Sequence, residues 1–120
     1  MLHLSVETIG QLSVIECKGR IVQSDAAFRL RAAVTSHGDS RIIVLDISEV
    51  SAIEGGGLGM LVFLDQWARD HAIDFKLCAP MGSVLQRLKL IRPIRAFDII
   101  SRREMMSLLA VADSDFALAA

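Results

Sequence analysis

The sequence predicts a single α/β domain with a mixed β-sheet, in which parallel central strands are covered by about four helices. The first observation behind this prediction is the apolar, β-branched run at residues 42–45, which is typical of a strand buried on both faces. The second is that most other strand-like segments are separated by helix-sized stretches with an apolar stripe, as crossover connections require. A chain of 120 residues is long enough to form one substantial core.

The first third of the chain is expected to form a hairpin followed by a helix. Residues 2–6 alternate between apolar and polar side chains, and residues 12–17 resume the strand pattern after a short turn at Gly10. Gly19 is expected to end this second strand and to leave a short extended segment. A helix then follows, capped by Ser24 or Asp25 and ending near residues 37–38.

The remaining elements alternate between strand and helix. We expect a strand at residues 41–47, a polar and glycine-rich turn, a helix to about residue 71, a strand at 73–79, a short helix at 84–91, a short strand at 97–100, and a last helix capped by Ser101 and ending at Leu109. Residues 3–110 form the predicted domain, and residues 111–120 are expected to be a loosely packed tail.

Composition excludes several classes of function. The 13 basic and 14 acidic side chains nearly cancel, which argues against a general nucleic-acid-binding protein, because such a protein needs a basic face. No apolar run approaches the ~20 residues of a membrane span, so direct membrane insertion is not expected. The N-terminus lacks a basic segment followed by an apolar one, which favours a cytoplasmic location. The two cysteines have no CxxC spacing and are expected to be buried, reduced thiols. The sequence leaves the oligomeric state open.

The glycine run at residues 55–57 is the sharpest local signal, because it joins the buried strand to the following helix. Such a turn leaves the first amides of the helix open to a partner. No Lys-Ser or Lys-Thr follows the glycines, and Met60 stands where GxGxxG requires its last glycine. Three interpretations remain: a purely structural turn, a surface for docking another protein, or a nucleotide- or anion-binding module.

No arrangement of residues indicates an enzyme, a cofactor site or a metal site. The three histidines lie on different expected elements, without the short spacing of metal ligands. No serine lies in a GxSxG elbow. The carboxylates of Asp46, Glu49 and Glu54 cluster near one end of the central strand, where turn-capping roles are more common than acid–base chemistry. Asp46 is expected to hydrogen-bond the turn that follows it.

The run VLDISEVSAIEGGGLGMLV resembles the signature of STAS domains, V-L-D-L-S-x-V-x-x-I-D-S-S-G-L-G, which lies between a central strand and the second helix. Weaker matches at residues 19–21, 76–88 and 97–99 extend the resemblance to residues 3–110. It implies a STAS fold and a relation to anti-sigma factor antagonists, also called anti-anti-sigma factors. Members of that group bind an anti-sigma factor that is also a serine kinase, and phosphorylation of a serine at the start of the second helix ends the binding.

The sequence departs from the family pattern at that serine. The alignment places Glu54 on the family aspartate and Gly55 on the phosphoacceptor, so phosphorylation is not expected at residue 55. By resemblance, the protein is a non-enzymatic regulator whose partner is a serine-kinase-type anti-sigma factor. The expected contact residues, within residues 51–60, are Ser51, Glu54, Gly55, Gly56, Gly57 and Met60. A STAS scaffold or transporter-associated subunit is the alternative.

Overall fold

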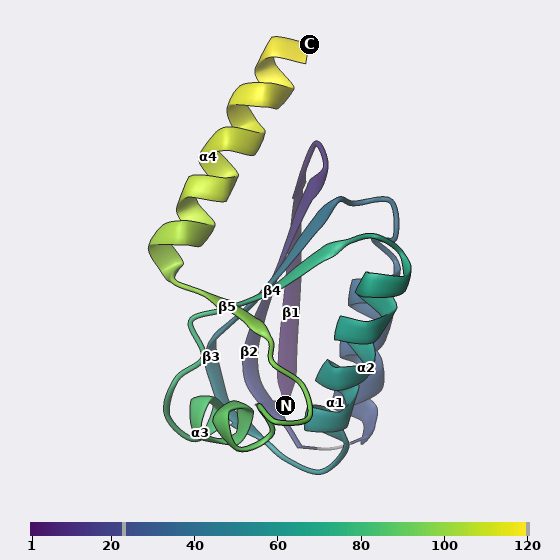
Figure 1. Cartoon of the computed structure of the whole chain (residues 1–120), viewed down its shortest axis with the longest axis vertical. Helices are drawn as coiled ribbons and strands as arrows, with labels where there is room; N and C mark the ends of the chain where they lie inside the picture. Colours follow the sequence, from purple (N-terminus) through teal and green to yellow (C-terminus); the bar gives the residue numbers. More distant parts are fainter. Residues whose placement is uncertain (23, 120) are drawn as a thin grey trace.

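The computed structural model describes residues 1–22 and 24–119 and contains one five-stranded sheet with helices on both faces (Figure 1). In chain order the elements are β1 (Leu2–Ile9), β2 (Leu12–Ile21), α1 (Ser24–Thr35), β3 (Ile42–Ile53), α2 (Gly56–Asp70), β4 (Asp74–Cys78), α3 (Gly82–Leu90), β5 (Asp98–Ile100) and α4 (Arg102–Ala119). The strands lie in the order β1-β2-β3-β4-β5, with β1 antiparallel to β2 and all other pairs parallel. The predicted mixed sheet with parallel central strands is confirmed.

The main core lies between the sheet and helices α1 and α2. Ile15, Leu45 and Leu77 occupy neighbouring register positions on β2, β3 and β4, and all three are fully buried. Leu30 of α1 and Leu64 of α2 pack into the same cluster and are also fully buried. Figure 1 shows the two helices side by side along the sheet. Alternation along the strands sends the intervening side chains to the opposite face.

A smaller apolar cluster on that opposite face receives the start of α4. Met105 packs there with Val14, Val44 and other strand residues. A capping box begins the helix: the Ser101 hydroxyl accepts a hydrogen bond from the Glu104 amide at 3.0 Å, and the Glu104 carboxylate accepts one from the Ser101 amide at 3.1 Å. The predicted cap is confirmed. The later turns of α4 extend past the sheet toward the C-terminus (Figure 1).

Three predicted boundaries are wrong. β3 does not end at Ile47 but continues to Ile53, because Val50 and Ile53 are buried and keep pairing with β2. Gly19 does not end β2; it lies inside the strand at a register irregularity with φ of 115°, where a side chain would clash with the Met1 carbonyl. α4 continues beyond Leu109 to Ala119.

The loosely packed tail at residues 111–120 stays a prediction. Residues 111–119 belong to α4, and residue 120 of the expected tail lies outside the described residues. The domain boundary at residue 110 stays a prediction. In the part of the chain that the structure describes, no helix combines the length and the apolar character needed to cross a bilayer.

Candidate functional site

The glycine turn lies at the carboxyl ends of the parallel strands, between β3 and α2. The Glu54 amide donates a hydrogen bond to the Ile21 carbonyl of β2 at 3.0 Å. The Gly57 amide donates to the Glu54 carbonyl, also at 3.0 Å. These two bonds fix the turn to the end of β2 and set the direction in which α2 starts. In open α/β sheets this edge is where ligands and partners are usually bound.

Gly55 has a backbone conformation that only glycine adopts without strain. Its φ is 54° and its ψ is −127°, and no side chain caps the helix that follows. The nearest atom to a Cβ placed there would be the Val22 carbonyl oxygen at 4.0 Å, so space is available. The backbone, not crowding, therefore disfavours any L-residue at position 55. Glycine at position 55 permits this turn.

Gly57 is buried, and the prediction that it is one of the exposed contact groups is wrong. A Cβ at this position would lie 2.5 Å from the Ile21 carbonyl oxygen, 2.8 Å from Ile21 Cγ2 and 3.0 Å from Ile53 Cγ1. The missing side chain lets the first turn of α2 approach the end of β2. Gly57 is therefore a packing residue that positions the helix and is not itself available to a partner.

Gly56 and Gly59 have the opposite environment. Both are exposed, and a Cβ on either would meet no atom within 4 Å. They are three residues apart and share one side of α2 with the half-buried Met60. The start of the helix therefore presents bare backbone to solvent. We use the name β3–α2 surface for the exposed or half-exposed groups of Ser51, Glu54, Gly55, Gly56, Gly59 and Met60.

Helix α3 borders this surface through contacts that the sequence did not reveal. The Arg87 guanidinium lies 3.4 Å from the Glu54 carboxylate, and the Ser83 hydroxyl donates to the Ser51 carbonyl at 3.3 Å. The Ser51 hydroxyl in turn donates to the Gly19 carbonyl at 3.3 Å. Because both partners of the Arg87–Glu54 pair are exposed, it contributes little to stability. It does place a cation beside Glu54.

Two exposed phenylalanines extend the apolar character of the outer face of α1 and α2. Phe63 is 42% exposed and lies three residues after Met60, and Phe28 of α1 is 58% exposed. The Arg31 guanidinium lies 4.9 Å from the centre of the Phe63 ring. A signal for Phe63 exists in the sequence, because Leu61 and Leu64 define the buried stripe of the helix and Phe63 falls outside it.

The polar side chain of Asp46, near the turn, is held by hydrogen bonds within the protein. Asp46 accepts hydrogen bonds from the Ser48 amide at 3.0 Å and from its hydroxyl at 2.7 Å. The prediction that Asp46 bonds the following turn is wrong, because Ser48 lies within β3, which continues to Ile53. Burial raises the pKa of Cys17 to about 12 and that of Cys78 to about 11, with Asp46 adding to both, so neither thiol is an activated nucleophile.

Among the described residues, no three or more His, Cys, Asp or Glu side chains lie together so that they could hold a metal ion.

A comparison with protein families matches residues 3–104 to the STAS domain. No curated protein matches the sequence closely enough to count as a relative. Among solved structures, the anti-sigma factor antagonist SpoIIAA in its unphosphorylated form is similar, with a TM-score of 0.70 at 15% identity, over 91% of this chain and 97% of that one.

Two further structures are similar in the same way. The phosphorylated form of SpoIIAA, a Bacillus cell fate determinant, gives a TM-score of 0.70 at 16% identity and covers 91% of this chain and 99% of its own. An anti-sigma factor antagonist from Mycobacterium paratuberculosis gives 0.68 at 20% identity, over 82% and 85% of the two chains. At these identities the likeness shows a shared fold.

Proposed function

The chain belongs to the STAS domain family, and from that premise we propose that it is a non-enzymatic regulator that binds another protein through the β3–α2 surface. The proposed partner is an anti-sigma factor of the serine-kinase ATPase type. The similarity to structures described as anti-sigma factor antagonists supports this class of partner. Binding takes place in the cytoplasm.

The open start of α2 is the observation that carries this proposal. Gly56 and Gly59 leave the helix backbone uncovered, so a partner can approach it closely without displacing side chains. Glu54 and Arg87 supply a charged edge beside this backbone, and Met60 supplies apolar area. An interface of this kind combines close packing at its centre with a polar rim.

The proposed regulator is not switched by phosphorylation at residue 55, because Gly55 has no hydroxyl. The two nearest serines on β3 are already engaged: Ser48 donates to Asp46 and Ser51 donates to Gly19. A kinase would have to break these bonds and distort a paired strand to reach either hydroxyl. Any regulation of this surface is therefore expected to act by a route other than phosphorylation of these residues.

Binding of purified kinase-type anti-sigma factors from the source organism, measured by calorimetry, tests the docking surface. The variant Gly56→Arg places a long cation on the open backbone, and we expect it to weaken binding by about thirtyfold or more. The matched control is Ala32→Arg, which adds the same side chain at an exposed position of α1. Equal binding by the wild type and Gly56→Arg would remove this surface from consideration.

A kinase assay tests the regulatory part of the proposal separately. Incubation with the cognate kinase and ATP should leave the intact mass of this protein unchanged, while an antagonist that retains the serine gains a phosphate under the same conditions. A phosphopeptide that contains Ser48 or Ser51 would contradict the proposal that this region is not phosphorylated, without affecting the docking result.

A further inference from the structure

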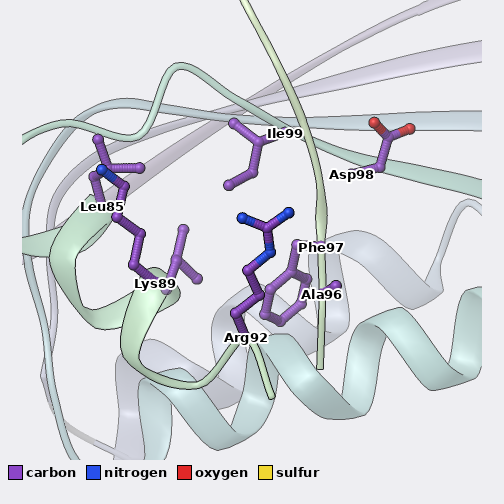
Figure 2. A pocket seen from close by; sticks show the side chains of 8 residues that line it. Leu85, Lys89, Arg92, Ala96, Phe97, Asp98 and Ile99 are labelled. Carbon is purple, nitrogen blue, oxygen red and sulfur yellow. The ribbon is translucent and has the colours of Figure 1, made fainter. Parts of the chain in front are cut away.

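A hollow of about 380 Å³ lies between α3, the turn after it and β5. Apolar side chains line it from both sides together with charged ones: Leu85 comes from α3, and Phe97 and Ile99 come from the segment that enters β5 (Figure 2). The volume lies within the range of small-molecule sites, which are mostly apolar and contain a few polar groups that fix orientation.

Two of the three charged residues that line this hollow are cationic. Figure 2 shows the Arg92 guanidinium directed between Ile99 and Phe97, and Lys89 at the edge beside Leu85. Neither Lys89 nor Arg92 takes part in an ion pair with any of the described residues. A guanidinium beside apolar walls is suited to a carboxylate or phosphate, because its planar fork can donate two parallel hydrogen bonds.

The acidic residue at the rim does not neutralise these cations. Asp98 lies at the edge of the hollow, and Figure 2 shows its carboxylate directed away from Arg92. It accepts a hydrogen bond from the Lys76 ammonium at 2.7 Å, and the same ammonium also pairs with Asp74 at 3.3 Å. The carboxylate is therefore already engaged by a cation of the sheet, and the hollow keeps a net positive charge.

We propose that this hollow binds a small amphiphilic anion, meaning a carboxylate or phosphate group on an apolar body. The anionic group pairs with Arg92 and Lys89, and the apolar body lies against Leu85, Phe97 and Ile99. The proposed ligand is a free molecule, and contact with a lipid bilayer is an alternative outcome of the test below. None of the residues that line the hollow belongs to the β3–α2 surface.

Calorimetry with sodium octanoate below its micelle concentration tests the proposal. We expect saturable binding with a Kd of about 0.1–1 mM. Acetate and 1-octanol, which each lack one half of the ligand, should bind at least about tenfold more weakly. Octanol binding as tightly as octanoate would overturn the proposal, as would the absence of saturable heat with octanoate. Sedimentation with anionic phosphatidylglycerol vesicles, without octanoate binding, would show a membrane contact instead.

Two pairs of variants locate the site. Arg92→Gln should weaken octanoate binding about tenfold, whereas Arg41→Gln, which removes an exposed arginine outside the hollow, should change it less than about twofold. Ile99→Asp should weaken binding more than Ile99→Asn, because the two side chains have the same size and only the first adds a carboxylate. The three positions that these four variants change are exposed, so the folded state should be retained. Equal effects within either pair would contradict the assignment.

Discussion

The most informative single substitution in the turn is Gly57→Ala, because it tests how closely α2 approaches the end of β2. The added methyl would lie 2.5 Å from the Ile21 carbonyl oxygen, which belongs to a hydrogen-bonded backbone and cannot rotate away. Overpacking of this kind costs about 1–3 kcal/mol, and the rigid neighbour places the expected cost near the upper end. That is a large share of the ~5–15 kcal/mol that stabilises a typical domain.

Thermal and urea unfolding followed by circular dichroism measure this cost. For a chain of this length, a loss of about 3 kcal/mol lowers the melting temperature by roughly 10–15 °C. The matched control is Gly56→Ala, one residue earlier, where the added methyl meets no atom within 4 Å and φ is not positive. We expect this control to be neutral or to gain up to about 1 kcal/mol.

The comparison refutes the structural reasoning if the two alanine variants melt within about 2 °C of each other. That result would mean that the first turn of α2 is not packed against β2 as described. The exposed glycines would then lose their role as an open helix face, because the helix would start in a different place.

Three other predictions concern the interior and the turn. Gly55→Ser should lower the free energy of unfolding by about 1–2 kcal/mol in urea titrations despite the open space, because the backbone there has φ of 54°; unchanged stability would show that the turn adopts another conformation. Asp65 is 5% exposed and lies 3.1 Å from Arg95, and this ion pair holds the segment after α3 to α2. Asp65→Asn should therefore lower the free energy of unfolding by about 2–3 kcal/mol, and the double variant Asp65→Leu/Arg95→Met should lower it less. The reverse order of the two losses in urea titrations would contradict this. Burial raises the pKa of Cys17 from 9.0 to about 12, so the folded thiol keeps its proton to higher pH than the unfolded one. This thiol therefore leaves the free energy of unfolding unchanged below pH 9.0 and lowers it as pH rises from 9.0 toward 12, because the unfolded thiol loses its proton first. Between pH 8 and 10.5, urea titrations should therefore show a smaller loss of stability for Cys17→Ala than for the wild type. Equal losses for the two proteins would contradict the raised pKa of Cys17.

Much of the fold follows from local patterns that have a physical cause. The apolar run at 42–45, the alternation in the first hairpin and the cap at Ser101 each identified an element that the structure contains. The end of β3 could not be found in this way. Polar Ser48 and Glu49 interrupt the apolar run, but pairing with β2 keeps the segment extended and buries Val50.

The end of α4 illustrates a different limit. The apolar stripe fades after Leu109, and this pattern predicts that the helix ends there. The following residues contain no glycine or proline, and alanine-rich segments with good intrinsic propensity extend a helix without needing a buried face. The weak apolar pattern after Leu109 therefore indicates an exposed helix and does not mark the end of the helix.

The sequence predicts where the candidate site lies, and the structure shows which of its residues are exposed. The glycine run marks the turn, but residue type alone cannot separate Gly57, which packs against Ile21, from Gly56, which is open. The contacts of Arg87 with Glu54 and of Ser83 with Ser51 join positions more than 30 residues apart. Such pairs depend on how α3 is placed against β3, and no local pattern encodes that placement.

The proposed docking surface is tested most directly by mapping the backbone amides of the labelled protein during titration with a kinase-type anti-sigma factor. The largest chemical-shift changes or line broadening should fall on residues 54–60, with smaller changes at Arg87 and Phe63. α4 should remain unaffected. Changes centred on α4 or on the hollow beside Arg92, with residues 54–60 unchanged, would contradict the account.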